Sequence, residues 1–341
     1  MKRTITLAIA LLLVLSFFAF AGGEQEDGAE QVETITLVGG VMLPEGHVYY
    51  RAIEKFTELL DEYYDGPIEV EYELHHSGAI GTEKDMFEFM MQGVSVDFAI
   101  VSPAWAATWD ESAPLIDAPF LFRSIPHWEA CLEQGALDPI AETIRQKGVR
   151  FIGYGGGGNR SMILNQPVES LEDLPNIDMR VQGSPLHARV FEAVGVNPTP
   201  LDYMEVYNAI KTGVVDGLEN EPAGLEGMKF YEVAPYYVMT EHQITTRILC
   251  FSEPRLQSFP EDLRDAIVRA GLDAGRWHRE TEVAEAEEIV DNLVANHGLT
   301  VIELSEAQRQ TLRERAMPVV EDYAAEIGAT EIFETIQAIE P

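Results

Sequence analysis

Strand-like and helix-like segments alternate near the start of the chain, and this alternation limits the possible folds more than any other feature. Apolar residues recur at every second position in the strand-like segments and at helical spacing in the others. The predicted strands span residues 34–38, 68–74 and 97–101, and the predicted helices span residues 49–60 and 82–92. This β-α-β-α-β order predicts an α/β fold with a mostly parallel sheet. Ligands of such sheets bind beyond the carboxyl ends of the strands.

A second α/β unit is predicted after Gly158. Its elements are a strand at 179–181, a helix at 185–194, a turn at Asn197-Pro198, a helix at 202–211 with Asp202 as its N-cap, and an extended segment at 214–218. The last third of the chain differs, because two long helical patterns, at 260–296 and 305–327, follow one another there. The first of these is weakened by Gly271 and Gly275.

The charge of the chain excludes two classes of partner. The 341 residues suggest about two domains. They carry 58 Asp and Glu against 23 Lys and Arg, which gives a net charge of -35. A surface of this charge repels nucleic acid and anionic lipid, so we expect neither as a partner. Cys131 and Cys250 are too few for a disulfide scaffold, and whether they pair stays open.

The N-terminal residues have the features of an export signal. Lys2 and Arg3 precede an apolar run at 7–20, and small residues flank Phe20 at the end of this run. We therefore expect residues 1–21 to be a cleaved signal peptide and residues 22–33 to be a flexible leader. The apolar run is shorter than a spanning helix needs. We accordingly predict an exported protein without direct membrane insertion.

The glycine-rich segment FIGYGGGGN at 151–159 contains a GxGxxG pattern. A dinucleotide site requires a helix directly after the last glycine, and the chain instead continues as a strand-like segment from Arg160. The segment is better interpreted as a flexible crossover between two lobes, although an ordinary glycine loop remains possible. We expect no cofactor.

Two groups of residues are candidates for metal ligands. His75 and His76 are adjacent, so they would point to opposite faces of a strand. Glu219 and Glu221 could bind a cation, but solvated carboxylates are the more common case. We therefore predict no metal ligands and no catalytic residues, and whether a cation binds near Glu219 and Glu221 stays open.

Arg160 and Arg180 lie near predicted strand ends of the second unit. A guanidinium group is permanently charged, and its planar fork pairs with a carboxylate through two hydrogen bonds. These arginines are candidates for binding an anionic ligand, and the alternative for each is a surface ion pair.

Several motifs resemble those of the substrate-binding proteins of TRAP transporters, the DctP-like family of periplasmic receptors. The order and spacing of these motifs carry the resemblance, which covers roughly residues 34–330. The motifs are GAIGTE at 78–83 followed by Gly93 and Asp97, PFLFR at 119–123, LEDL…MRV at 171–181, NPTP…Y…EVY…VDG…EN at 197–220 and KFYEV at 229–233.

The resemblance implies a periplasmic-binding-protein-like α/β fold. Two lobes enclose a ligand cleft, and a long helix spans both lobes. We expect lobe I to comprise residues 34–157 and 246–285, and lobe II to comprise residues 158–245 and 286–341.

The resemblance also assigns roles to eight residues. Arg180 matches the arginine that pairs with the ligand carboxylate, and Arg160 matches a second arginine near the ligand. Tyr203 matches an aromatic position of the cleft, and Asn220 a polar contact from the second lobe. The first-lobe positions that face the ligand in relatives are Glu83, Ser102, Trp105 and His47.

The implied function is that of an extracytoplasmic receptor, which is not an enzyme. It would bind a small organic-acid anion such as a uronate, close by hinge bending, and deliver the ligand to membrane subunits of a TRAP transporter in the periplasm. The alternatives are an exported α/β enzyme acting on organic acids and a sensor or adhesion module.

Overall fold

The computed structural model describes residues 33–341, and the predicted signal peptide and nearly all of the predicted leader lie outside this range. The first five elements are those expected from the alternation. They are β1 (Thr34–Gly40), α1 (Val48–Tyr63), β2 (Glu69–His75), α2 (Glu83–Gln92) and β3 (Phe98–Val101). β1 pairs in parallel with both β2 and β3. The prediction for this segment is confirmed, with small differences at the element ends.

Side-chain caps fix where the first helices begin. His47 caps α1, because its Nδ1 accepts a hydrogen bond of 3.2 Å from the backbone N–H of Tyr49. Thr82 and Asp85 form a capping box at the start of α2, in which each side chain accepts from the backbone N–H of the other. The two caps place the first turns of α1 and α2 at the carboxyl ends of β1 and β2.

Two long antiparallel strands connect the lobes through the middle of the sheet. They are β4 (Val149–Leu164) and β8 (Tyr236–Ser252). The strand order within the described residues is β2-β1-β3-β8-β4-β7-β5-β6, with β9 (Thr300–Glu303) paired to β8. The sheet is therefore parallel within each lobe and antiparallel at its centre. The glycine-rich segment is not a loop, because β4 continues through it to Leu164.

The second lobe contains β5 (Asp178–Val181), α5 (Pro185–Val194), β6 (Asn197–Pro200) and β7 (Gly217–Asn220). The turn predicted at Asn197-Pro198 is wrong, because these residues pair with β5 as an edge strand, where proline is tolerated. Asp202 is at an N-cap position as predicted, but the element that follows directly is a 3₁₀ turn, and the Asp202 side chain makes no capping hydrogen bond there. A short 3₁₀ turn, η4 (Tyr203–Glu205), precedes the helix α6 (Val206–Lys211).

The sequence patterns missed the shorter elements that connect these units. The short 3₁₀ turns are η1 (Pro103–Thr108), η2 (Ala113–Asp117), η3 (Leu174–Asn176) and η5 (Phe230–Glu232). The additional helices are α3 (Ile125–Glu133), α4 (Asp138–Gln146), α7 (Pro222–Gly227), α8 (Glu253–Gln257) and α11 (Thr330–Ala338). The helix predicted at 305–327 is present as α10 (Glu306–Glu326) and packs on α5.

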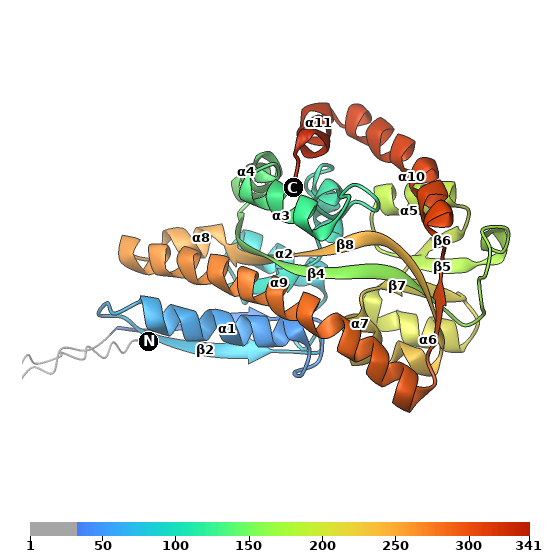
Figure 1. Ribbon diagram of the computed structural model, residues 1–341. Helices are drawn as coiled ribbons and strands as arrows, with labels where there is room; N and C mark the ends of the chain where they lie inside the picture. Colours follow the sequence, from blue (N-terminus) through green and yellow to red (C-terminus); the bar gives the residue numbers. More distant parts are fainter. Residues whose placement is uncertain (1–32) are drawn as a thin grey trace, which may run out of the picture.

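The long helix α9 (Glu261–His297) crosses the molecule and packs on α1, β4 and α7 (Figure 1). It thus contacts both lobes. The helix is continuous through Gly271 and Gly275, which lie against β4. A Cβ atom at Gly153 of β4 would overlap the carbonyl oxygen of Gly271. The glycines that weaken the helical pattern therefore allow the helix backbone to approach the strand.

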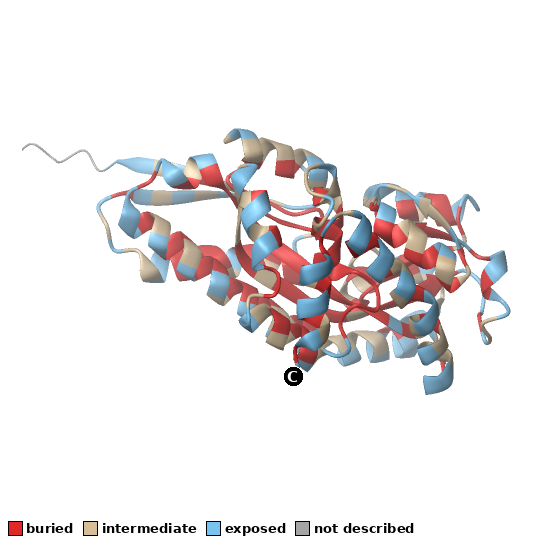
Figure 2. Cartoon of the chain, turned by 90° about the horizontal axis from the view of Figure 1, so that it is seen from above, coloured by how far each residue is buried: buried red, intermediate tan, exposed pale blue. Residues whose placement is uncertain are grey.

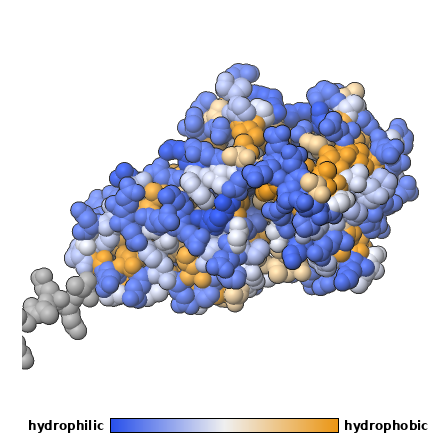
Figure 3. Space-filling model, turned by 60° about the horizontal axis from the view of Figure 1, so that its bottom comes forward, coloured by the Kyte–Doolittle hydropathy of each residue, from blue (hydrophilic) through white to orange (hydrophobic). Residues whose placement is uncertain are grey.

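Buried residues run along the sheet through both lobes, whereas the outer helix faces are exposed (Figure 2). Cys131 and Cys250 are both fully buried and unpaired. One face of the molecule is mainly hydrophilic, with separate apolar patches (Figure 3). Within residues 33–341, no helix has the length and apolar character needed to cross a membrane.

Candidate ligand-binding site

A small, partly open cavity of about 30 Å³ lies where the two lobes meet, and seven of the eight predicted site residues line it. Its walls come from α1, α2 and the β3–η1 connection on one side, from β5, η4 and β7 on the other, and from β4 and β8 between them. The residues that line it are Leu43, Tyr49, Glu83, Ser102, Trp105, Arg160, Arg180, Gln182, Tyr203, Asn220, Glu221 and Arg247.

Arg180 presents unpaired hydrogen-bond donors to this cavity. It is almost completely buried, and its Nε donates a hydrogen bond of 3.0 Å to the carbonyl oxygen of Leu201. Its guanidinium carbon lies 5.5 Å from the centre of the Tyr203 ring. Among residues 33–341, nothing accepts a hydrogen bond from its two terminal nitrogens. Burial lowers the pKa of Arg180, but an arginine remains cationic at any physiological pH. The free end of the fork suits a carboxylate.

Arg160, in contrast, is fully engaged by two carboxylates and a carbonyl group. Its Nε lies 2.5 Å from Glu219 Oε2, its Nη1 pairs with Glu221, and its Nη2 donates to the Glu219 carbonyl oxygen at 2.8 Å. All three residues are buried. The expectation that Glu219 and Glu221 are solvated is therefore wrong, because Arg160 is their buried counterion. Among the described residues, no His, Cys, Asp and Glu cluster could hold a metal ion.

His242 completes the cluster around Glu219. Its Nε2 lies 3.5 Å from Glu219 Oε2, while its Nδ1 contacts the hydroxyl of Thr240 at 2.7 Å. Burial alone would raise the pKa of Glu219, but the charge of Arg160 and the hydrogen bond with His242 outweigh it and hold this pKa well below its usual value. Glu219 is therefore ionised and fixes the orientation of Arg160.

The second-lobe wall is organised by a direct contact between two predicted site residues. Asn220 Nδ2 donates a hydrogen bond of 2.6 Å to the hydroxyl of Tyr203. Burial raises the pKa of Tyr203 above its usual value, so the hydroxyl stays protonated. The wall therefore offers polar atoms beside the Arg180 fork.

Three contacts connect the first-lobe wall to the second lobe. The hydroxyl of Ser102 donates to Gln182 Oε1 at 2.6 Å, and the hydroxyl of Tyr49 donates to Glu221 Oε1 at 2.9 Å. The Trp105 ring lies directly against the backbone of Gly183, where a Cβ atom would overlap it. These contacts form only when the lobes are close together.

Arg247 is a cavity residue that the sequence analysis missed. It lies on β8 and is 6% exposed, and its guanidinium carbon lies 5.6 Å from the centre of the Tyr49 ring. The signal was present, because Arg247 is the only charged residue between Gln243 and Ser252 in a run rich in β-branched and apolar residues. Such a run is typical of a buried strand, and a buried strand arginine needs a partner.

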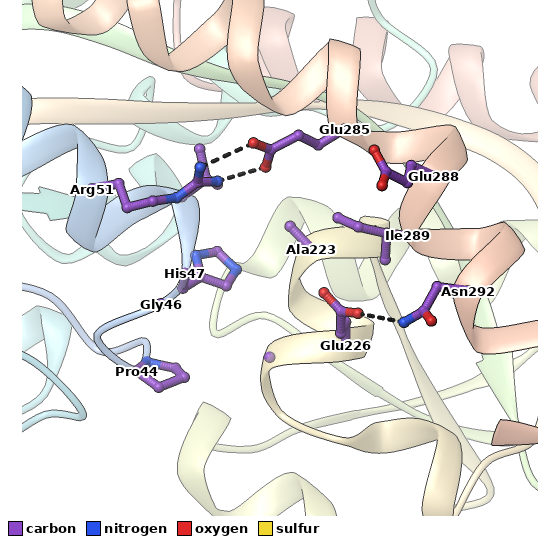
Figure 4. Close-up of a pocket in the computed structure, with 12 residues that line it drawn as sticks. Pro44, Gly46, His47, Arg51, Ala223, Glu226, Glu285, Glu288, Ile289 and Asn292 are labelled. Atoms are coloured by element: carbon purple, nitrogen blue, oxygen red, sulfur yellow. Dashed lines mark hydrogen bonds and ion pairs between the residues drawn. The ribbon is translucent and has the colours of Figure 1, made fainter. Parts of the chain in front are cut away.

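His47 does not reach this cavity. It lines a separate hollow of about 570 Å³ between α1, α7 and α9 (Figure 4). Its ring lies against Gly227, where a Cβ atom would be 2.9 Å from His47 Cδ2. Burial lowers the pKa of His47 to about 3, so its ring is neutral. The Arg51–Glu285 pair and the Glu226–Asn292 hydrogen bond cross the same hollow.

Comparison with known proteins gives the family. Residues 39–326 match the family described as bacterial extracellular solute-binding protein, family 7. This chain belongs to that family. Its members are solute-binding proteins of the TRAP type and not enzymes. A solute-binding protein of Sulfitobacter sp. strain NAS-14.1 is 40% identical over 309 residues, which are 90% of this chain and 92% of that protein.

Solved structures of TRAP periplasmic solute-binding proteins have the same fold. One from Sulfitobacter sp. NAS-14.1, with bound α-D-taluronate, has a TM-score of 0.85 and 40% identity over 89% of this chain and 97% of that chain. Another from Chromohalobacter salexigens, with bound D-glucuronate, has a TM-score of 0.81 and 26% identity over 88% of this chain and 99% of that chain. The predicted two-lobe fold with a long helix across both lobes is therefore confirmed.

Proposed function

We propose that this TRAP solute-binding protein captures a sugar acid of the hexuronate class and holds its carboxylate on Arg180. The observation that carries the proposal is the contrast between two buried arginines. Arg160 has its hydrogen bonds satisfied by the protein, whereas the terminal nitrogens of Arg180 have no protein acceptor. Relatives with bound taluronate and glucuronate support the choice of ligand class.

Binding requires the lobes to separate first. A cavity of about 30 Å³ has room for only a few water molecules, so a sugar acid cannot enter the closed form. Contacts of both lobes with the ligand then favour closure. The contacts between Ser102 and Gln182 and between Tyr49 and Glu221 add to the stability of the closed form.

The predicted lobe boundaries lie at one of three register shifts in the pairing of the central strands β4 and β8. The β4–β8 pairing shifts register between Gly156 and Asn159, opposite Thr246 and Ile244. Gly156 and Gly157 there have φ angles of 99° and 107°, which favour glycine. We place the hinge at this point, and hence the change from lobe I to lobe II at residues 157/158 and 245/246.

The partners and the location follow from the family. The closed receptor would deliver its ligand to the membrane subunits of a TRAP transporter. A cleaved signal peptide at residues 1–21 would export the chain to the periplasm. Co-purification of the mature chain with such subunits, in the presence of the ligand, tests this part of the proposal.

Isothermal titration calorimetry of the mature chain tests the ligand class. We expect D-taluronate, D-galacturonate or D-glucuronate to bind more tightly than succinate and pyruvate. Arg180→Ala should weaken uronate binding at least about tenfold, because a charge-assisted hydrogen bond contributes about 1.5–3 kcal/mol. Arg189→Ala, which removes a partly exposed arginine that does not line the cavity, is the control. Equal affinity in wild type and Arg180→Ala would refute the proposal.

A further inference from the structure

A second group of charged residues lies at the cavity, around Arg247. Its Nη1 donates to the carbonyl oxygen of Thr246 at 2.9 Å and lies 3.6 Å from Asp117 Oδ2. Its Nε is buried and has no partner within the described residues. The guanidinium group of Arg247 packs on the Tyr49 ring. That of Arg180 packs on the Tyr203 ring and donates a hydrogen bond to the carbonyl oxygen of Leu201. The two guanidinium groups therefore come from different elements and have different surroundings.

Two carboxyl groups oppose the charge of Arg247. Asp117 is fully buried, and neither of its oxygens has a hydrogen-bond donor within the described residues. Two ionisable side chains approach it. They are Arg247, and His187, whose Nε2 lies 3.9 Å from Asp117 Oδ1. Glu83 lines the same cavity from α2, and Arg247 is the positive charge that acts on it most strongly. Burial raises the pKa of both carboxyl groups, because charge is costly there.

Arg247 therefore shares its subsite with two carboxyl groups, whereas no described residue pairs with the terminal nitrogens of Arg180. A hydroxyl group can accept a hydrogen bond from Arg247 and donate one to Glu83, because it is both a donor and an acceptor. A second carboxylate has no proton to donate, and it would bring a further negative charge into a buried site where negative charge is already costly for Glu83 and Asp117. The subsite thus matches an uncharged, hydroxylated group and disfavours a dianion.

We propose that Arg247 and Glu83 bind a hydroxyl-bearing end of the ligand and, with Asp117 behind them, exclude a second carboxylate. The proposal rests on the proposed function, in which Arg180 holds the carboxylate. It makes the protein selective for polyhydroxylated monocarboxylates over the corresponding dicarboxylates. Arg247 rather than Arg160 then supplies the second guanidinium that touches the ligand.

The test uses two probes with the same carbon chain and a different number of carboxylates. D-galacturonate is a pyranose ring in solution with one carboxylate, and galactarate is acyclic with a carboxylate at both ends. D-galactonate, which is acyclic with one carboxylate, is the control for the missing ring and should also bind more tightly than galactarate. Calorimetry of the mature chain should give affinity at least about tenfold higher for galacturonate. Arg247→Met should weaken galacturonate binding at least about tenfold through loss of a charge-assisted hydrogen bond. Far-ultraviolet circular dichroism and thermal melting verify that this variant is folded.

Glu83→Gln is the decisive variant, because it removes a charge and keeps the shape of the side chain. We expect it to shift the affinity ratio toward galactarate at least about fivefold, and Asp117→Asn to shift it in the same direction. Glu205→Gln, which removes an exposed carboxylate of η4 that does not line the cavity, should leave the ratio unchanged.

The outcomes separate this proposal from the function on which it rests. Unchanged galacturonate affinity in Arg247→Met, or an unchanged ratio in Glu83→Gln, overturns the subsite while Arg180 dependence still stands. Wild-type binding of galactarate as tight as that of galacturonate also overturns it. Loss of Arg180 dependence removes both proposals together.

Discussion

The base of the cavity around Arg160 and the second-lobe wall around Arg180 use the same side chain in opposite ways. At the base, a guanidinium group and two carboxylates satisfy one another in a buried cluster. At the wall, the terminal nitrogens of Arg180 face the cavity without a protein partner. The comparison teaches that the surroundings of an arginine, and not its charge or burial, decide whether it is available to a ligand.

The largest expected effect is a loss of stability when Arg160 at the base of the cavity is replaced. Arg160→Met should destabilise the protein by about 3–5 kcal/mol, because it leaves Glu219 and Glu221 buried without a counterion. Chemical denaturation measures the change in the free energy of unfolding. Arg189→Met is the matched control, because it removes an exposed ion pair worth at most about 1 kcal/mol. A loss in Arg160→Met no larger than in the control would contradict the structural role.

The next effect is a loss of ligand affinity when Arg180 in the second-lobe wall is replaced. Arg180→Lys should lose at least about tenfold in uronate affinity, since an ammonium group lacks the planar fork. Its free energy of unfolding without ligand should change little, because Arg180 has no carboxylate partner in the protein. Calorimetry and chemical denaturation measure the two quantities. A variant that unfolds readily but binds normally would reverse the comparison between base and wall.

A smaller effect is expected where the first lobe meets the wall. Gly183→Ala should weaken ligand binding about fivefold, because the added methyl group overlaps the Trp105 ring, and overpacking costs about 1–3 kcal/mol. The loss should be seen in affinity more than in stability, since opening of the lobes relieves the overlap. Gly46→Ala is the control, because a Cβ atom there meets no other atom within 4 Å. Equal affinity in both variants would show that this contact does not limit closure.

The last prediction concerns the pH dependence of stability. Asp117 is behind Arg247, and burial raises its pKa from 3.8 to about 7. The folded protein therefore binds a proton on Asp117 more tightly than the unfolded chain, so this residue makes stability decrease as pH rises from about 4 to about 7. In Asp117→Asn this contribution is absent, and the variant should gain stability relative to wild type over the same range. Urea denaturation at several pH values measures the difference, and a constant difference would contradict the raised pKa.

Much of the fold could be predicted from the sequence. α5 and α9 have helical patterns with clear ends, and their predicted bounds agree with the structure within a residue or two. β8 has no such pattern, because a strand buried at the centre of a sheet is neither alternating nor amphipathic. The edge strand at Asn197–Pro200 was hidden by its prolines. These errors have a common cause, since the position of a strand in the sheet is not encoded locally.

The candidate site was also only partly predictable, because some of its contacts join segments that are far apart in the chain. The motif resemblance gave seven residues that the structure brings to one cavity. It did not give Arg247, whose strand was missed, and it did not show that Arg160 is neutralised by residues 59 and 61 positions away. It also did not give the contact of Trp105 with Gly183, which depends on how the lobes meet. Distances between segments far apart in the chain decide these details.

The complete burial of Cys131 and Cys250 has a practical consequence for following lobe movement. Because neither native thiol is accessible, dyes that react with thiols would label only cysteines introduced on the surface. Lys84 of α2 and Met204 of η4 are both exposed, and they line a hollow of about 380 Å³ between these two elements. A donor and an acceptor fluorophore at these two positions would convert opening and closing into a change in energy transfer, without prior removal of any natural cysteine.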